Sequence, residues 1–389
     1  MEKYNLTFQF SKKIKYILAL LILVGIAALA YGILSYSPEK IWSALLLNSV
    51  NFLTIGLGAT FFLAVHIITQ SGWHVSIQRI PEAISMSLPF GAIFMIIMLF
   101  GLNHVFHWTH EIHHDPVIAA KEAYLNIPFF IIRLIIYLAV WILLTYILRR
   151  LSVKSDIENG LKFYKKSKTY AALFLVFFAL TIVSFAWDWL MSIEAHWFST
   201  LFGWYVLSGV IVKSFAAIII IIAILRWLGY LEFVTTDNIH DLARYLFSFA
   251  IFWMYLWFSQ FMLIWYANIP EETFYFIKRI ENYEFLFLLN LALNFLIPFL
   301  VLMIRKLRRI LWVVTAMAIV VLAGQWIDQY LMIFPGTMKD AQTIGLFDIG
   351  LTIGFIGIFL WVVLHFLTKA NLMPKNHPYL QESFHYENL

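Results

Sequence analysis

Long apolar segments alternate with short polar connections along the whole chain. Each segment exceeds roughly 18 residues, the length that lets a helix cross the apolar core of a bilayer. A backbone exposed to lipid must satisfy its own hydrogen bonds, so every segment is expected to be a helix. The predicted spans are 14–35, 41–68, 83–102, 127–149, 169–190, 199–226, 243–267, 284–304, 310–334 and 343–368. The pattern therefore predicts an all-α, polytopic membrane protein with about ten transmembrane helices.

The spans are expected to form one integral membrane domain over residues 1–389. Spans two to five (41–190) and six to nine (199–334) would make two four-helix units in the same orientation, flanked by 14–35 and 343–368. In each unit the second helix leads into a long aromatic loop, 103–126 or 268–283. Parallel repeats of this kind occur in membrane transporters. The polar residues 370–389 would form a cytoplasmic tail.

Composition agrees with this prediction and removes several classes of function. The chain is 62% hydrophobic and 13% charged, whereas soluble domains are about 45–50% apolar and about 25% charged. It has no cysteine, which excludes cysteine-ligated iron–sulfur clusters, covalently attached haem, disulfides and thiol catalysis in this chain. The sequence also lacks a phosphate-binding glycine loop, a zinc-protease motif and a Ser/His/Asp arrangement.

Basic residues are distributed unequally between the two sets of loops. Of the 27 Lys and Arg residues, twenty lie on the side of both termini, five lie on the other side, and Arg133 and Lys213 lie inside spans. The positive-inside rule then places both termini in the cytoplasm. This distribution explains the net charge of +5 without a nucleic-acid partner. The loops rich in His, acids and aromatic residues, at 103–126, 188–198 and 268–283, would face outward.

Ionisable and amide side chains inside spans are the candidate functional residues, because such groups are costly at membrane depth. Lys213 lies near mid-membrane, roughly 15 Å below the outer surface at 1.5 Å per residue. Nearer the outer ends lie Arg133, Gln260, Asn290, Asn294, Gln325 and Asp328, and His66 lies toward the cytoplasmic end. This distribution indicates a proton path, or a pocket for a quinone head with proton access. The alternative is that these groups only join helices, with Arg133 and Asp328 as a structural ion pair.

The turn between spans five and six holds a second set of candidates. Asp188, Glu194 and His196 would lie at its outer surface, as the mouth of the same path. In the preceding outward loop, His residues recur at three-residue spacing, and His110, His113 and His114 are the nearest candidates for metal ligands. The same loop also suits the docking of a partner through its histidines and Trp108. We predict no metal site there.

Three stretches resemble one family. They are W-D-W-L-M-S-I-E-A-H-W-F-S-T-L-F-G (187–203), K-E-A-Y-L-N-I-P-F-F-I-I-R (121–133) and Q-F-M-L-I-W-Y-A-N-I-P-E-E-T (260–273). These stretches, with the ten-span layout, resemble the ActF-type membrane subunit of bacterial alternative complex III, within the NrfD/polysulfide-reductase-like proteins. The residues that fall within the matched motifs are Arg133, Asp188, Glu194, His196, Gln260, Glu271 and Glu272.

The resemblance implies a multi-pass subunit of a respiratory quinol:cytochrome c oxidoreductase in the bacterial inner membrane. Its implied partners are a sister NrfD-like subunit, an iron–sulfur subunit, multihaem and monohaem cytochromes c, and a haem–copper oxidase. Haem c and iron–sulfur clusters would then belong to those partners, and menaquinone or ubiquinone is the only cofactor expected near this chain. We expect a contribution to proton translocation, to quinone binding, or to both. The alternatives are a purely structural scaffold subunit and a secondary transporter.

Overall fold

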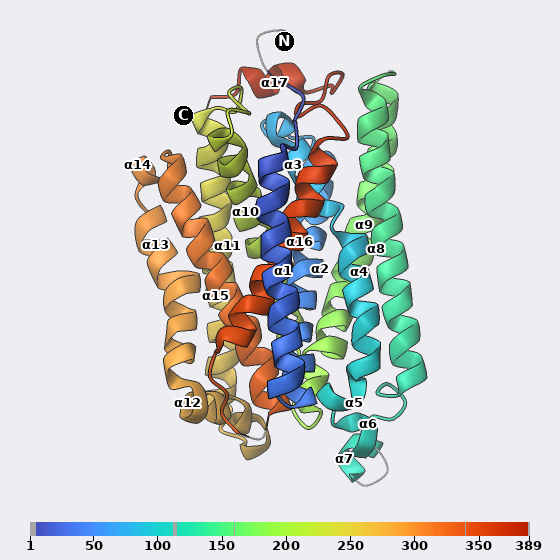
Figure 1. Cartoon of the computed structure of the whole chain (residues 1–389), viewed down its shortest axis with the longest axis vertical. Helices are drawn as coiled ribbons and strands as arrows, with labels where there is room; N and C mark the ends of the chain where they lie inside the picture. Colours follow the sequence, from blue (N-terminus) through green and yellow to red (C-terminus); the bar gives the residue numbers. More distant parts are fainter. Residues whose placement is uncertain (1–4, 112–114, 159, 339, 388–389) are drawn as a thin grey trace.

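A computed structural model describes residues 5–111, 115–158, 160–338 and 340–387, and every regular element in these ranges is helical. Ten stretches within them are long and apolar enough to cross a membrane (Figure 1). They are α1 (Lys12–Ser35), α2 (Pro38–Ile68), α3 to α5 (Arg79–Val105), α8 (Ile127–Ser155), α9 (Gly160–Trp189), α10 (Phe202–Trp227), α11 (Thr236–Ala267), α12 to α13 (Pro270–Leu302), α15 (Leu311–Thr337) and α16 (Leu346–Leu367). The protein is thus an all-α, multi-pass membrane protein, as predicted.

Both ends of the described chain lie at the same end of the bundle (Figure 1), as an even number of spans requires. There the amide of Leu372, after α16, donates a hydrogen bond to the carbonyl of Leu6 at 2.7 Å. We call this end the terminal face. The other end, which carries the turns after α5, α9 and α11, is called the opposite face. Short helices decorate both ends, including α6 (Trp108–Glu111), α7 (Pro116–Ala119), α14 (Arg305–Arg308) and α17 (Leu380–Phe384).

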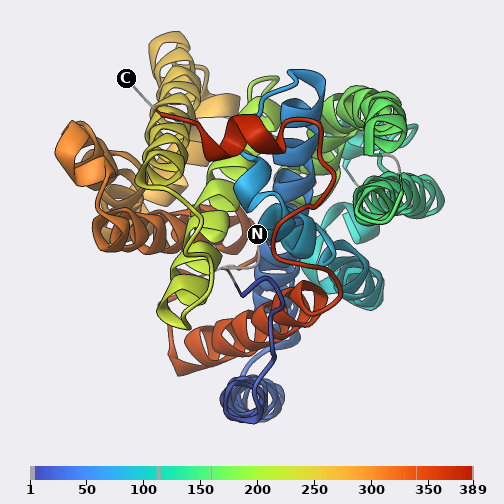
Figure 2. The ribbon, with the colours of Figure 1, turned by 90° about the horizontal axis from the view of Figure 1, so that it is seen from above.

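Helices α2 and α10 form the centre of the bundle and are its most buried spans (Figure 2). They approach closely at Gly58, where a Cβ atom would lie 2.0 Å from Oγ of Ser214. Helices α3, α4 and α9 pack on one side of this pair, and α11 and α15 pack on the other. The first helices of the two predicted four-helix units are therefore in contact. The division into two repeats remains a prediction.

The predicted loop 268–283 is wrong, because most of this segment is helical. Helix α12 (Pro270–Leu291) begins with proline and two acidic residues, Glu271 and Glu272, which favour a helix N-terminus. Its first turns bury Tyr275 and Arg279 and expose the other side. The chain then turns into the bundle at Tyr283, whose backbone is not helical (φ −136°, ψ 31°). An amphipathic helix of this kind escapes a search for continuous apolar runs.

The predicted connection 149–168 is also mostly helical. Helix α8 continues to Ser155, and α9 starts at Gly160, nine residues before the predicted start at 169. The start of α9 is rich in Lys, a residue with good helix propensity, so the helix extends past its apolar part. The charged residues between 149 and 168 show where the apolar parts of α8 and α9 end, but both helices continue beyond those parts.

Candidate functional site

The buried carboxylate of Asp328 is the centre of a polar cluster between α10, α11, α12 and α15. It is 3% exposed and accepts hydrogen bonds from three side chains. Asn290 Nδ2 donates at 2.9 Å and Trp253 Nε1 at 3.3 Å, and the hydroxyl of Tyr205 donates as well. Helices α10, α11 and α12 thus supply one donor each. The carboxylate is held in place from three sides.

A row of amides extends this cluster toward the centre of the membrane. Gln325 Nε2 donates to Asn294 Oδ1 at 2.9 Å, and Asn294 Nδ2 donates to Asn290 Oδ1 at 2.6 Å. A single π-helical turn, η4 (Ala292–Leu296), interrupts the span here, and such turns often occur at functional sites. Gly324 makes room for the row, because a Cβ atom there would lie 2.8 Å from the Asn294 side chain. Every amide in the row donates in the direction of Asp328.

Lys213 lies beyond the head of this row, on α10. Its ammonium group donates to Asn51 Oδ1 at 3.1 Å and to Thr54 Oγ1 at 3.0 Å, both on α2. The residue is 2% exposed, and no carboxylate of the described residues lies within 4.0 Å of its nitrogen. One helical turn away, Gly209 faces the amide row, since a Cβ atom there would lie 2.6 Å from Gln325 Oε1. The lysine and the aspartate thus lie at the two ends of one buried polar region.

A small cavity adjoins Asp328 on the side of the opposite face. Its volume is about 20 Å³, and its polar lining is Tyr205, Gln260, Tyr275, Arg279, Asn290 and Asp328. One water molecule needs about 10–15 Å³ of such space. A quinone ring is several times larger and does not fit between these side chains as they stand. The cavity suits water and the protons that water carries.

Arg133 does not pair with Asp328, so that predicted ion pair is wrong. Its guanidinium group donates to both carboxylate oxygens of Asp188, with Nε–Oδ2 at 2.9 Å and Nη2–Oδ1 at 2.8 Å. Tyr124 supplies its carbonyl at 3.0 Å and places its ring 3.9 Å from the guanidinium carbon. The reason is the packing of the helices: α8 lies against α9, and α15 lies against α10 and α12.

The predicted open mouth at Asp188 and Glu194 is likewise closed by ion pairs. Glu194 accepts from Arg279 Nη2 at 2.7 Å, and Arg279 also donates to the carbonyl of Leu331 at 2.9 Å. Of the three predicted residues Asp188, Glu194 and His196, only His196 is exposed, and its Nε2 lies 2.6 Å from Asp115 Oδ2. That hydrogen bond holds the pKa of the Asp115 carboxyl below its usual value. The turn is therefore fixed rather than open.

The three motifs that carry the family resemblance meet at this end of the bundle. The 121–133 and 187–203 stretches are joined by the Arg133–Asp188 pair, and by Lys121 Nζ, which donates to the carbonyl of Ala195 at 2.5 Å. Burial lowers the pKa of Lys121. The third stretch, 260–273, is joined to the 187–203 stretch by a hydrogen bond that the hydroxyl of Ser199 donates to Gln260 Oε1 at 3.4 Å. Motifs that are distant in sequence are thus joined at this end of the bundle, and Gln260 of the third motif also lines the small cavity.

His66 lies apart from this cluster, near the terminal face. Twelve residues of α2 separate it from Thr54, or about 18 Å of helix. The stretch between them packs apolar side chains and Gly58 against α10. Its Nδ1 atom lies 2.8 Å from the carbonyl of Phe62, and its ring lies 4.7 Å from that of His74. The predicted continuity from Lys213 to His66 is absent as a chain of hydrogen bonds among the described residues.

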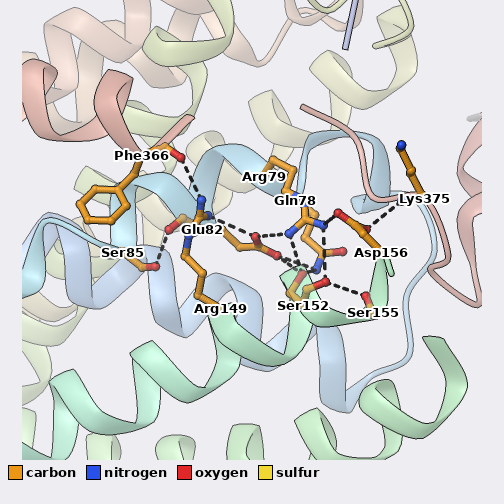
Figure 3. A network of polar contacts seen from close by, with 10 residues as sticks. All are labelled: Gln78, Arg79, Glu82, Ser85, Arg149, Ser152, Ser155, Asp156, Phe366 and Lys375. Atoms are coloured by element: carbon orange, nitrogen blue, oxygen red, sulfur yellow. Dashed lines mark hydrogen bonds and ion pairs between the residues drawn. The ribbon is translucent and has the colours of Figure 1, made fainter. Parts of the chain in front are cut away.

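A second buried network, around Glu82, is not predicted by the sequence pattern (Figure 3). The carboxylate accepts from Arg79 Nη1 at 2.7 Å, from Arg149 Nη1 at 3.2 Å and from Ser152 Oγ at 2.5 Å. Arg79 also pairs with Asp156 at 2.6 Å, and burial raises the pKa of that aspartate. The hydropathy pattern counts both arginines as loop charges. The one available signal is the i, i+3 spacing of Arg79 and Glu82 at the start of an apolar segment.

The histidines of the outward loop form no cluster in the described structure. His110 Nε2 lies 3.1 Å from the carbonyl of Asn103, and His113 and His114 lie outside the described residues. Within the described ranges, no three His, Cys, Asp or Glu side chains are arranged to hold a metal ion. The chain matches no protein-family model, and no curated protein is significantly similar to it.

Proposed function

We propose that this chain is the integral membrane subunit of a respiratory quinol:cytochrome c oxidoreductase of the alternative complex III type, and that it takes part in proton translocation. The observation that supports the proton role is the buried polar region that has Lys213 at one end and Asp328, with its row of amides, at the other. Ionisable side chains at membrane depth are costly and mark ion and proton pathways. The assignment to this kind of complex rests on the three motifs and the ten-span layout.

The side chains divide into those that exchange protons and those that position them. Asp328, Tyr205 and Lys213 carry exchangeable protons, and the cavity beside Asp328 has room for one water molecule. The amides of Asn290, Asn294 and Gln325 fix this geometry. Asp328 would exchange protons with the opposite face through that water, while Lys213 responds to the charge on Asp328 through the low-dielectric interior.

Quinol oxidation itself is assigned to a neighbouring subunit, because the cavity near Asp328 is too small for a quinone ring. Haem c and iron–sulfur clusters would lie in the partner subunits named above. The complex would sit in the bacterial inner membrane with the terminal face toward the cytoplasm. That orientation is supported by the twenty basic residues on the side of the termini, against five on the other.

Purification in mild detergent tests the membership of a complex. The chain should copurify with c-type cytochromes, detected by haem absorbance, and with an iron–sulfur subunit. Isolation of the chain as a solitary, active solute transporter would contradict the proposal.

The proton role is tested by Lys213→Met and Asp328→Asn in the assembled complex, reconstituted into vesicles. Quinol oxidation should continue, while the number of protons moved per electron falls. Ser208→Ala is the matched control, since Ser208 is buried on the same helix but donates only to the carbonyl of Tyr205 at 2.7 Å. An unchanged proton ratio in both test variants would instead identify a scaffold.

A further inference from the structure

The segment after α16 crosses the terminal face and is tied down at both ends. Its part over residues 375–386, which we call the strap, includes α17 and lies across the end of α2 and its neighbours (Figure 2). At one end, the amide of Lys375 donates to Asp156 Oδ1 at 2.9 Å. At the other end, the hydroxyl of Tyr386 donates to Asp241 Oδ2 at 2.5 Å, on α11. The strap thus joins two helices from different sides of the bundle.

The middle of the strap satisfies backbone groups of the turn after α2. The amide of Gly72 donates to Glu382 Oε1 at 3.2 Å, and the amide of Ser76 donates to Ser383 Oγ at 3.0 Å. Ser383 Oγ also lies 3.3 Å from the carbonyl of Trp73. Without the strap the amides of Gly72 and Ser76 lose these partners, which is costly unless water replaces them, whereas the Trp73 carbonyl still accepts from Asn238 Nδ2. These contacts explain why the polar strap is held against the terminal face of the bundle.

Beneath the strap lies a cavity of about 20 Å³ beside Glu82. Its polar lining is Gln78, Glu82, Ser152, Ser155, Tyr164, Ser167 and His377. The ring of His377 closes it from the strap side, 5.2 Å from the ring of Tyr164 and 6.5 Å from that of His74. Glu82 therefore belongs both to the cavity lining and to the polar network drawn in Figure 3.

Several polar atoms around this cavity are buried without a protein partner. Gln78 Oε1 belongs to the cavity lining, while Arg79 Nε, His74 Nε2 and His66 Nε2 belong to neighbouring side chains outside it; all four side chains are at most 4% exposed. Buried polar atoms in native proteins are nearly always hydrogen-bonded, to water where protein groups are absent. A polar cavity of this size holds a water molecule.

We propose that the cavity beside Glu82 is a water-binding site and that the strap is its lid, with His377 as the closing side chain. The lid is independent of the proposed function, because it lies at the terminal face, away from the Asp328 cluster. Its opening would admit solvent from the terminal face to a buried carboxylate and two histidines.

Burial keeps the rings of His377 and His74 uncharged under the closed lid at neutral pH. The groups that face it are Glu82 and Arg79 from α3, Tyr164 from α9, His74 from the turn, and Tyr379 from the strap itself. Burial lowers the pKa of His377 to about 4, and burial holds the pKa of His74 well below its ordinary value. Both rings are therefore uncharged in the closed state at pH 7.

Single-cysteine labelling tests the lid directly, since the natural chain has no cysteine. Ser167→Cys places a thiol in the cavity, and Lys165→Cys places an exposed thiol on the same helix as the matched control. The full-length protein in lipid nanodiscs is treated at pH 7.5 with a charged thiosulfonate reagent. The cavity thiol should react at least about tenfold more slowly than the control thiol, as expected for a site reached only by local opening.

Two strap variants should remove this protection. Glu382→Gln with Tyr386→Phe weakens anchors away from the cavity, and His377→Ala removes the closing ring. Each should raise the labelling rate of the cavity thiol by about tenfold, the effect on an opening equilibrium of losing one or two hydrogen bonds, with the control rate unchanged. Equal rates for the two thiols without any strap change would overturn the lid. So would an unchanged rate for the cavity thiol in both variants, once their thermal unfolding shows that they are folded.

Pulsed radiolysis tests the bound water, because radicals formed from a buried water oxidise the side chains beside it. Tyr164 should be oxidised within milliseconds although the thiosulfonate does not reach its cavity. Phe178, 1% exposed in the apolar core, is the control and should stay unmodified. Failure of Tyr164 to react above this control would overturn the water site.

Discussion

Two buried charges, Asp328 and Lys213, differ in how the surrounding side chains satisfy them. Asp328 receives three donors, from Tyr205, Asn290 and Trp253. Lys213 has only two neutral acceptors, Asn51 and Thr54. An ammonium group has three protons to donate, so its hydrogen bonding is incomplete in the described structure. The loss of either acceptor should therefore lower the stability of the protein, because it leaves a buried donor of Lys213 without a partner.

Thr54→Val should destabilise the protein by about 1–3 kcal/mol, because it removes an acceptor from a buried donor without changing shape. The double variant Thr54→Val with Lys213→Met should recover most of this loss, since no unsatisfied donor then remains. Thermal unfolding of the purified variants measures both. A double variant no more stable than Thr54→Val alone would show that Thr54 acts through packing instead.

The sequence predicts the depth of a residue in the membrane, but it does not predict which helices are neighbours in the bundle. Depth and helical spacing correctly group Gln325 with Asp328, and Asn290 with Asn294, because each pair lies within one helix. The predicted partner of Arg133 is wrong, because choosing between Asp188 and Asp328 requires knowing which helices are neighbours. Three other arginines are counted as loop charges, since hydropathy does not distinguish a buried helix end from solvent. These arginines are Arg79, Arg149 and Arg279. The partners of Arg149 and Arg279, Glu82 and Glu194, are distant in sequence and leave no local pattern, whereas the i, i+3 spacing of Arg79 and Glu82 is the one local signal.

At the scale of elements, the π turn in the eighth span and Gly324 on α15 depend on each other. Gly324→Ala should displace the side chain of Asn294, since the added Cβ atom would lie 2.8 Å from it. We expect a loss of about 1–3 kcal/mol, typical of overpacking, and a lower proton ratio in the assembled complex. Ala323→Ser, adjacent but exposed, should change neither quantity. If the Gly324→Ala complex moved as many protons per electron as the parent complex, the amide row would not be needed for proton translocation.

The strap should open as the pH falls. Once open, His377 regains its ordinary pKa near 6.5, whereas burial lowers the pKa to about 4 in the closed strap. The open form therefore binds protons more tightly, and the closed form loses stability as the pH falls from 6.5 toward 4. One pH unit below 6.5 corresponds to about 1.4 kcal/mol, or about tenfold.

The labelling rate of the cavity thiol at position 167, divided by that of the control thiol at position 165, measures this opening. The ratio cancels the pH dependence of the thiols themselves and should rise about tenfold between pH 7.5 and 5.5. His377→Gln should flatten the rise to the part that His74 contributes. A ratio that stays level in the parent protein would mean that the strap does not respond to protonation.

At the scale of the whole molecule, α1 is attached to the bundle mainly through α16. The two helices cross at Gly25 and Gly354, where a Cβ atom on Gly354 would lie 2.5 Å from the Gly25 Cα atom. The rest of α1 is largely exposed and faces lipid. The α1–α16 contact is thus an extensive interface along both helices, with glycine at the point where they approach most closely.

Gly354→Val should separate α1 from α16 while leaving the other spans in place. Ala28→Cys and Gly350→Cys report on the interface, because a Cβ atom on Gly350 would lie 2.7 Å from that of Ala28, within reach of a disulfide after a small adjustment. Oxidation should cross-link the parent double cysteine variant and fail to do so after Gly354→Val. Val363→Ala, farther along α16 and away from α1, should leave the cross-link intact. Cross-linking that survives Gly354→Val would contradict the close glycine contact.

The same contact has a consequence for the order of events during synthesis. Helix α1 ends at residue 35, and its partner α16 begins at residue 346. At about 5–20 residues per second, a ribosome needs roughly 15 to 60 s to make the intervening chain. During that time α1 must persist in the bilayer with lipid as its main neighbour. Its sequence meets that demand, because α1 is the most apolar of the ten spans and carries no Asp, Glu, Lys or Arg after Lys15.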